Sequence, residues 1–205
     1  TSVSRGLGDV YKRQISCCYT TCIIYICLFR KVSSKRPNSW ERERLMKFSV
    51  NKAKRTLLGN RRRGYTLPTN NKLYPAQWNW DSAFIALGYS YFNLDFSITE
   101  IETLLNGQWD DGMVPHILFH EKDTSYFPNH TTWQCGKNIP SSGITQPPVL
   151  ASILRKIVEK NQLSNEQHSR IKKIITKIKN YHDWFIKFRD PCLLYTSPSP
   201  RDTEV

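Results

Sequence analysis

Residues 74–82, YPAQWNWDS, decide how the rest of the chain is interpreted. Two later segments repeat their residue types: 107–116 (GQWDDGMVPH) and 141–148 (SSGITQPP). Together the three segments hold three of the six tryptophans, with aspartate, glutamine and histidine beside them. A sugar ring has C–H faces that pack on indoles, and its hydroxyls need directional partners such as carboxylates and carboxamides. The three segments therefore predict a carbohydrate-binding site, and the remaining chain is its scaffold.

The two ends of the chain do not look like parts of a folded domain. Residues 1–14 and 192–205 resemble translated sequencing adapters, so we exclude both from the fold prediction. Residues 15–45 precede the first methionine, Met46, and three interpretations stay open: untranslated leader, signal-like segment or membrane anchor. The apolar part, 15–29, is shorter than the ~20 residues of a spanning helix, and its basic flank follows it, which favours a leader. We expect 15–45 to be poorly ordered and the domain to occupy 46–191.

The positive charge of the chain allows a second kind of function. The net charge is +13, and ten lysines and arginines lie between residues 155 and 189. A basic helical module that binds nucleic acid is therefore one alternative. These residues alternate with an unbroken apolar face, as in any solvated amphipathic helix, so we expect no nucleic-acid partner. We also expect no membrane partner unless residues 15–29 are an anchor.

Cysteine usage predicts neither a disulfide framework nor a metal site. Of the six cysteines, only Cys135 lies within residues 46–191. The run CC-x3-C-x4-C at 17–27 lacks paired zinc-knuckle spacing and has no histidine, so we expect no metal there. The lone Cys135 favours a reducing compartment such as the cytoplasm, although the location stays open. The sequon at Asn129 would matter only in a secreted chain.

The spacing of apolar residues predicts an all-α fold of about five helices without a strand. The predicted helices cover 44–60, 82–93, 97–106, 146–157 and 164–190. Asp81 or Ser82 is expected to cap the second helix, and capping boxes are expected at Ser97/Glu100 and Ser164/Gln167. The last helix should bury one apolar face, made of Ile171, Ile174, Ile175, Ile178, Tyr181, Phe185 and Phe188.

The predicted site segments all lie at helix entries or just past helix exits, as on the rim of a helical toroid. Residues 117–144 show no periodicity and form a long loop, which we expect to be functional or packed over the site. The order of YPAQWNWDSAFIALGY, GQWDDGMVPHILF, YFP and SSGITQPPVLA resembles the N-terminal half of the mannosylglycerate hydrolase-like catalytic domain of glycoside hydrolase family 63 and its relatives. The resemblance covers about 57–191. It implies an incomplete part of an (α/α)6 barrel, hydrolysis of α-glycosidic bonds with inversion, and no metal or organic cofactor.

The resemblance also implies which residues line the sugar-binding end of the barrel. These are Tyr74, Gln77, Trp78, Trp80, Asp81, Gln108, Trp109, Asp111, His116 and Gln146. A structural role is the alternative for each residue taken alone. In that role the tryptophans would be core residues, Asp81 would cap a helix, Asp110 and Asp111 would form a turn with Gly112, and His116 would be a buried structural histidine.

An inverting glycosidase needs a general acid and a general base, roughly 6.5–9.5 Å apart. The resemblance implies an acid soon after an Arg-Asp-Pro turn, which here is 189–191 and is followed by adapter-like sequence. The catalytic residues are thus unknown and expected beyond Pro191. We expect a fragment that is inactive alone and, because its helix faces lack partners, marginally stable or prone to aggregate. A non-catalytic carbohydrate-binding scaffold is the alternative.

The substrate stays open among mannosylglycerate, glucosylglycerate and other α-glucosides. The basic residues Arg61–Arg63 and Lys72 would favour a glycerate carboxylate.

Overall fold

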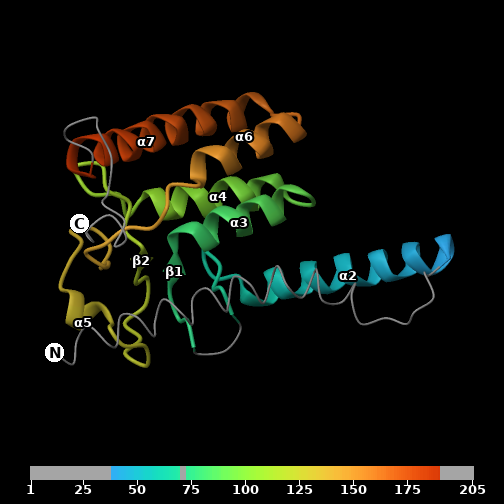
Figure 1. Cartoon of the computed structure of the whole chain (residues 1–205), viewed down its shortest axis with the longest axis horizontal. Coiled ribbons are helices and arrows are strands. Elements are labelled where there is room, and N and C mark those ends of the chain that lie inside the picture. Colours follow the sequence, from blue (N-terminus) through green and yellow to red (C-terminus); the bar gives the residue numbers. More distant parts are fainter. Residues whose placement is uncertain (1–37, 70–72, 190–205) are drawn as a thin grey trace, which may run out of the picture. The chain divides into compact units, whose positions relative to one another are not determined.

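The computed structural model describes residues 38–69 and 73–189 (Figure 1). The adapter-like ends, the apolar run 15–29 and Lys72 lie outside the described residues. The chain divides into two units, residues 1–52 and 53–205. In the first unit, the described residues 39–52 are helical, and a Glu43–Lys47 pair four residues apart supports that helix. All the interactions described below lie in the second unit.

The described residues contain six helices and two short strands. Their bounds are α2 Ser39–Asn60, β1 Gln77–Trp78, α3 Asn79–Ser90, α4 Leu94–Leu105, β2 Ile117–Leu118, α5 His130–Trp133, α6 Leu150–Lys160 and α7 Asn165–Arg189. The all-α prediction is confirmed for the bulk of the chain. The prediction of a fold without strands was wrong, because β1 and β2 pair antiparallel, with Gln77 opposite Leu118 and Trp78 opposite Ile117. Both segments are buried, so their backbone groups need partners outside a helix.

Helix α3 begins three residues earlier than predicted, and neither Asp81 nor Ser82 caps it. Its N-cap is Trp78, which makes no side-chain capping bond. Partners distant in sequence satisfy the first backbone donors instead: Asn79 N donates to His116 O (3.0 Å), and Trp80 N donates to Gln146 Oε1 (3.1 Å). The first and third predicted site segments are therefore joined by the hydrogen bond that starts this helix.

Helix α4 begins at Leu94, and the predicted Ser97/Glu100 capping box is wrong. The N-cap is Asn93, whose side chain accepts from Phe96 N at 3.0 Å. Ser97 and Glu100 lie inside the helix and are buried. The C-terminal stop was predicted correctly, since the helix ends at Leu105 with Asn106 as its C-cap.

The prediction for α6 placed its prolines too far into the helix, whereas that for α7 was right. Pro147 and Pro148 precede the α6 N-cap, Val149. At α7 the capping box forms in both directions: Gln167 N donates to Ser164 Oγ (3.2 Å), and Ser164 N donates to Gln167 Oε1 (3.0 Å). The α7 box needs no distant partner, because both of its bonds join residues three apart.

Replacing Ser164 with alanine is expected to lower the free energy of unfolding by about 1 kcal/mol, because one orphan N–H at the start of α7 loses its acceptor. Ser169→Ala, at an exposed position of the same helix, is the matched control and should change little. Denaturant titration of both variants checks the prediction. Equal midpoints for the two would contradict it.

Helices α3 and α4 form one hairpin and α6 and α7 a second; α3 packs on α6 and α4 on α7 (Figure 1). The core lies between the hairpins and includes Ile98, Ile101 and Leu104 of α4 with Leu154 and Ile157 of α6. Helix α7 buries Ile171, Ile174, Ile178 and Tyr181 as predicted, and Trp184 completes the stripe.

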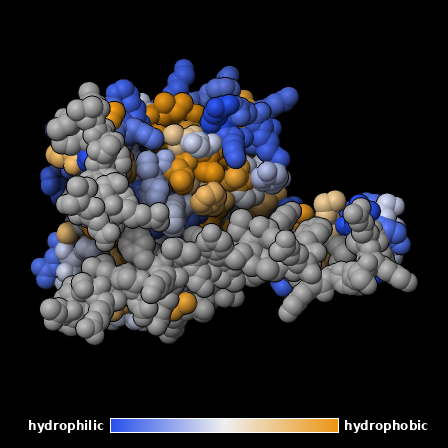
Figure 2. All heavy atoms as spheres, in the orientation of Figure 1, coloured by the Kyte–Doolittle hydropathy of each residue, from blue (hydrophilic) through white to orange (hydrophobic). Residues whose placement is uncertain are grey.

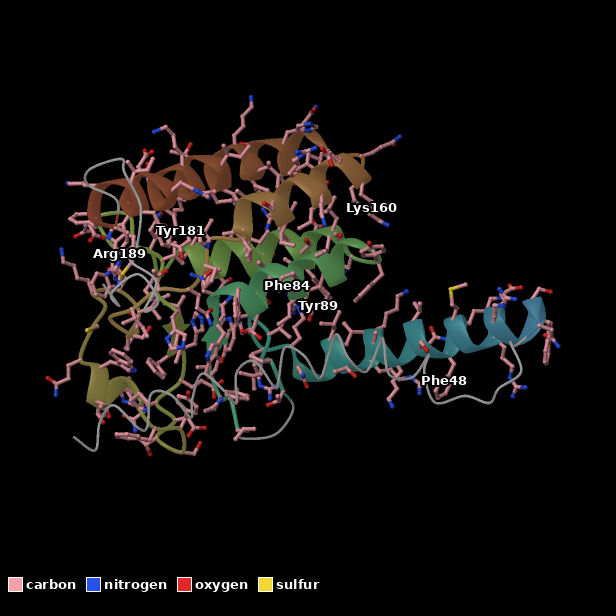
Figure 3. All side chains as sticks on the ribbon, viewed as in Figure 1. Phe48, Phe84, Tyr89, Lys160, Tyr181 and Arg189 are labelled. Atoms are coloured by element: carbon pink, nitrogen blue, oxygen red, sulfur yellow. The ribbon has the colours of Figure 1, made fainter. Side chains whose placement is uncertain are left out.

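Some apolar residues of the second unit remain exposed. Ile175 and Phe188 were predicted in the buried face of α7 but are about half exposed, at 53% and 46%. Phe84 on α3 is also exposed (Figure 3). Hydrophobic residues gather on the visible face near α3 and α4, below the hydrophilic surface of α6 and α7 (Figure 2). No helix in the described ranges is long and apolar enough to cross a membrane.

Candidate functional site

The predicted site segments meet at the side chain of Tyr181, which lies fully buried on α7 (Figure 3). Its hydroxyl donates to Gln146 O (2.8 Å), accepts from Asn79 Nδ2 (3.2 Å) and lies 2.5 Å from Thr145 Oγ1. Asn79 Nδ2 also reaches the carbonyls of residues 114 and 115, each at 3.3 Å. The phenol thus joins the start of α3 to the segment before α6, and Asn79 extends this contact to the loop after α4.

Tyr181→Phe is expected to lower the free energy of unfolding by about 1–3 kcal/mol, since buried polar groups around the lost hydroxyl are left without a partner. Tyr91→Phe, which removes a hydroxyl from a side chain that is 64% exposed, is the control. Hydrogen exchange should show the loss of protection at both ends of the contact, in peptides from residues 79–83 and 144–150. A uniform change across the chain would argue against the role of Tyr181 as a local anchor.

The loop after α4 is fixed by its own polar residues. Gln108 Nε2 donates to the carbonyl oxygens of Gly112 and Lys177, both at 2.8 Å. Asp111 Oδ1 accepts from Met113 N (3.0 Å), so it makes the predicted turn, and its Oδ2 accepts from Trp184 Nε1 (3.0 Å). The second predicted segment is thereby attached to α7.

Two adjacent serines connect this loop to the interior. Trp109 Nε1 donates to Ser141 Oγ at 3.2 Å, whereas Ser142 Oγ lies 3.2 Å from His116 Nδ1. Burial lowers the pKa of His116 to about 4, so its imidazole is neutral at pH 7. His116 can therefore act as a hydrogen-bonding group without carrying charge.

The interior side of the site is an aromatic cluster around Trp78. Its indole meets the rings of Tyr74 (5.2 Å), Tyr126 (5.4 Å) and His116 (6.4 Å) edge to face. The Trp78 Nε1 donor is buried and has no hydrogen-bond partner among the described residues. Burial, followed by the nearby Tyr74, raises the pKa of Tyr126 to about 12, so this phenol stays protonated.

Sequence reasoning missed two residues of this region, Tyr126 and His120. Tyr126 stands in the YFP motif that contributed to the family resemblance, so that motif was the available signal. His120 Nε2 lies 2.7 Å from Gln77 Oε1. Gln77 is fully buried, and its Nε2 donates to the backbone carbonyl (3.2 Å) and the side chain (3.1 Å) of Glu100. No local pattern linked Gln77 with Glu100, because α3 separates them.

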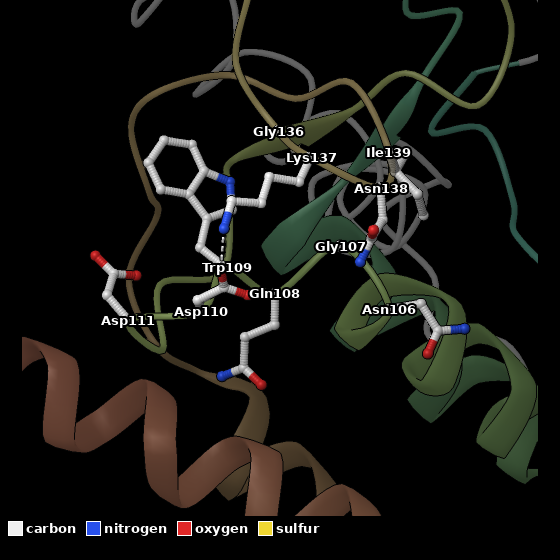
Figure 4. Close-up of a pocket in the computed structure, with 10 residues that line it drawn as sticks. All are labelled: Asn106, Gly107, Gln108, Trp109, Asp110, Asp111, Gly136, Lys137, Asn138 and Ile139. Atoms are coloured by element: carbon white, nitrogen blue, oxygen red, sulfur yellow. Dashed lines mark hydrogen bonds and ion pairs between the residues drawn. The ribbon is translucent and has the colours of Figure 1, made fainter.

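A recess of about 330 Å³ opens beside the second segment (Figure 4). Predicted residues Gln108, Trp109 and Asp111 line it. An ion pair between Lys137 and Asp110 crosses it, marked in Figure 4, but both side chains are largely exposed and the pair adds little stability. The recess offers an indole, carboxylates and amides to a small polar ligand, and its remaining lining residues are Asn106, Gly107, Gly136, Asn138 and Ile139.

Other predicted polar features have structural roles. The Arg61 guanidinium lies 3.8 Å from the centre of the Phe96 ring, and Arg62 Nη1 donates to the backbone carbonyls of Gly59 and Arg61, so both side chains have protein contacts. The sequon residue Asn129 is buried and accepts from Thr131 N (2.9 Å) as the cap of α5. No group of three or more His, Cys, Asp or Glu that could hold a metal occurs within 38–69 and 73–189.

Comparison with known proteins decides the family. The sequence profile of the mannosylglycerate hydrolase MGH1-like glycoside hydrolase domain matches residues 74–199. The chain belongs to this glycoside hydrolase family. The chain is 40% identical over 139 residues to mannosylglycerate hydrolase MGH2 of Selaginella moellendorffii, covering 67% of this chain and 28% of the relative. It is 41% identical over 143 residues to the mannosylglycerate hydrolase of Thermus thermophilus, covering 68% and 34%.

Solved structures of the same family show which fold this chain has. The glycoside hydrolase family 63 mannosylglycerate hydrolase of Thermus thermophilus in complex with Tris superposes with a TM-score of 0.64 at 40% identity, covering 69% of this chain and 34% of that chain. A second structure of that enzyme contains Tris and D-glycerate. The chain therefore forms part of an (α/α)6 barrel, as the family resemblance implied. It spans about a third of the length of these relatives.

Proposed function

We propose that this chain supplies the sugar-binding wall of an inverting α-glycosidase that acts on mannosylglycerate or glucosylglycerate. The observation that carries the proposal is the unpaired indole N–H of Trp78, which lies in an aromatic cluster where three polar segments converge. A buried donor without a partner costs free energy, and a ligand hydroxyl would remove that cost. The relatives support the substrate class, because they include mannosylglycerate and glucosylglycerate hydrolases.

In this proposal the predicted residues divide into contact and positioning residues. The carboxamide N–H groups of Gln77 and Gln108 are already used by protein carbonyl and carboxyl oxygens, so these two residues hold the wall in place. We assign the sugar contacts to the other predicted residues, and Tyr126 joins them; these are Tyr74, Trp78, Trp80, Asp81, Trp109, Asp111, His116 and Gln146.

We place the general acid and general base outside the described residues, beyond Pro191. Support comes from the occupation of the carboxylates near the site. Asp110 pairs with Lys137, both oxygens of Asp111 accept hydrogen bonds, and Glu100 is buried behind β1. Asp81 also has a protein partner and is assigned to hydroxyl binding.

Titration of the full 205-residue chain with mannosylglycerate, glucosylglycerate, mannose and D-glycerate tests the proposal. We expect saturable quenching of tryptophan fluorescence by the glycosides, at least tenfold weaker in Trp78→Phe and Asp81→Asn, with no hydrolysis of either glycoside. The control Trp133→Phe changes a tryptophan outside the cluster. Absence of saturation by all four compounds would overturn the binding function. Turnover that Asp81→Asn abolishes would instead show that a catalytic carboxylate lies here.

A non-catalytic carbohydrate-binding protein would use the same wall, and the occupied carboxylates favour it equally. Adding the continuation of the chain beyond Pro191 separates the two functions. Hydrolysis that appears with the longer chain identifies an enzyme, and unchanged binding without hydrolysis identifies a scaffold.

A further inference from the structure

A buried carboxyl group lies directly behind the site. Glu100 on α4 is 1% exposed, and its hydrogen-bond partners are all uncharged. Its Oε1 accepts from Ser82 Oγ (2.7 Å) and Gln77 Nε2 (3.1 Å), and its Oε2 lies 2.8 Å from Thr66 Oγ1. Burying a carboxylate without a cation is costly, so this group needs a special explanation.

The hydrogen bonds beyond Thr66 indicate how Glu100 is protonated. Thr66 Oγ1 lies 3.1 Å from Tyr89 Oη, which in turn donates to Leu57 O at 2.9 Å. The row Glu100–Thr66–Tyr89–Leu57 thus contains three contacts. With an ionised carboxyl only the two hydroxyl protons serve these three contacts, so one pair of oxygens faces each other without a proton. A protonated carboxyl supplies the third proton and completes the row.

The partners of Oε1 explain what this carboxyl does for the site. Gln77 and Ser82 flank residues 78–81, which include Trp78, Trp80 and Asp81, and both bind the same oxygen atom. The other end of the row reaches the C-terminal part of α2 through Tyr89, whose side chain points from α3 toward that helix (Figure 3). One side chain on α4 therefore binds the residues on both sides of 78–81.

We infer that Glu100 is a neutral carboxylic acid in the folded protein below neutral pH and is the positioning residue of the segment that carries Trp78, Trp80 and Asp81. The inference rests on the proposed function for its significance to sugar binding. Burial agrees with it, since desolvation raises the pKa of Glu100 to about 7 despite its hydrogen bonds.

The titratable groups around Glu100 do not offer it a compensating charge. Tyr89 on α3 and Tyr65 on the 61–67 loop are phenols whose pKa is raised by burial. His120, which reaches Glu100 only through Gln77, has its pKa lowered to about 4 by burial. Arg61 lies over Phe96. Protonation is therefore the simplest way to neutralise the buried carboxylate of Glu100.

Infrared spectroscopy of the full chain tests the protonation. At pH 6 the wild-type protein should show the carbonyl stretch of one buried carboxylic acid, and Glu100→Gln should lack it. Glu166→Gln, which removes an exposed carboxylate on α7, is the control and should retain the band. A band of unchanged intensity in Glu100→Gln would overturn the inference.

Hydrogen exchange tests the positioning. A glutamine can accept from Gln77 and Ser82 with its oxygen and donate to Thr66 with its amide, whereas alanine can do neither. Glu100→Gln should therefore keep the protection of peptides from residues 77–83, and Glu100→Ala should lose it at least tenfold. Raising the pH from 6 to 8 should lower protection of this segment in the wild type but not in Glu100→Gln.

Equal loss of protection in the two variants, or a pH effect that survives in Glu100→Gln, would overturn the positioning role. Neither measurement involves a sugar. A failure of the proposed binding function would thus appear only in the ligand titrations, and a failure of this inference only here.

Discussion

Replacing Gly112 with alanine is expected to lower the free energy of unfolding by about 2–6 kcal/mol. Gly112 has φ of +103°, and a Cβ built on it would lie 2.5 Å from the carbonyl oxygen of Asn180. A left-handed conformation at a residue with a side chain costs about 1–3 kcal/mol, and overpacking against backbone adds a similar amount. The carbonyl cannot move away without distorting α7.

Gly59→Ala is the matched control, because a Cβ at Gly59 would meet nothing within 4 Å. It lies in α2, where alanine is favoured over glycine, so we expect no loss of stability. Denaturant titration measures both variants, and hydrogen exchange should locate the damage of Gly112→Ala in peptides from 107–113 and 177–184. Similar stability of the two variants would contradict the role of Gly112 in docking the loop on α7.

The second large effect is the contribution of Glu100 to the pH dependence of stability. The pKa of a free glutamate is 4.5, and that of Glu100 is raised to about 7. Its contribution is fully present below pH 4.5 and is lost as pH rises through 7, because the folded state holds the proton more tightly than the unfolded state does. The shift corresponds to about 3 kcal/mol between pH 4.5 and 8.

Two buried histidines make the stability rise with pH over part of this range, which opposes the effect of Glu100. Burial lowers the pKa of His116 and His120 to about 4, so their contribution is present above pH 6.5 and is lost as pH falls toward 4. The measured quantity is therefore the difference between the wild type and Glu100→Gln at each pH, in which the histidines cancel. We expect Glu100→Gln to gain about 3 kcal/mol relative to the wild type between pH 4.5 and 8. A constant difference would mean that Glu100 titrates normally.

Features set by neighbouring residues could be predicted from the sequence. The α7 capping box joins Ser164 and Gln167, and the buried stripe of α7 follows helical spacing from Ile171 to Tyr181. The all-α class and the end of α4 at Leu105 have the same local origin. Features set by distant residues could not be predicted. Helix α3 begins at Asn79 because His116 O and Gln146 Oε1 accept its first backbone donors.

The candidate site likewise contains features that could be predicted from the sequence and features that could not. Residue types alone predicted that Trp80 and Gln146 belong to one site, and in the structure a hydrogen bond joins these two residues directly. The same reasoning treated Glu100 as a helix cap, because Ser-x-x-Glu before an apolar run fits a capping box equally well. Only the packing of α4 against α3 and β1 shows that this carboxyl is turned inward.

The two serines at 141 and 142 limit how the length of this chain can vary during evolution. Ser141 serves Trp109 in the outer recess and Ser142 serves His116 in the interior, since successive side chains of an extended segment point to opposite sides. Deleting a single residue just before them would exchange their directions and present each hydroxyl to the wrong neighbour. Insertions and deletions among relatives should therefore accumulate at 121–125, where the side chains are mostly exposed, and should be absent from 139–146.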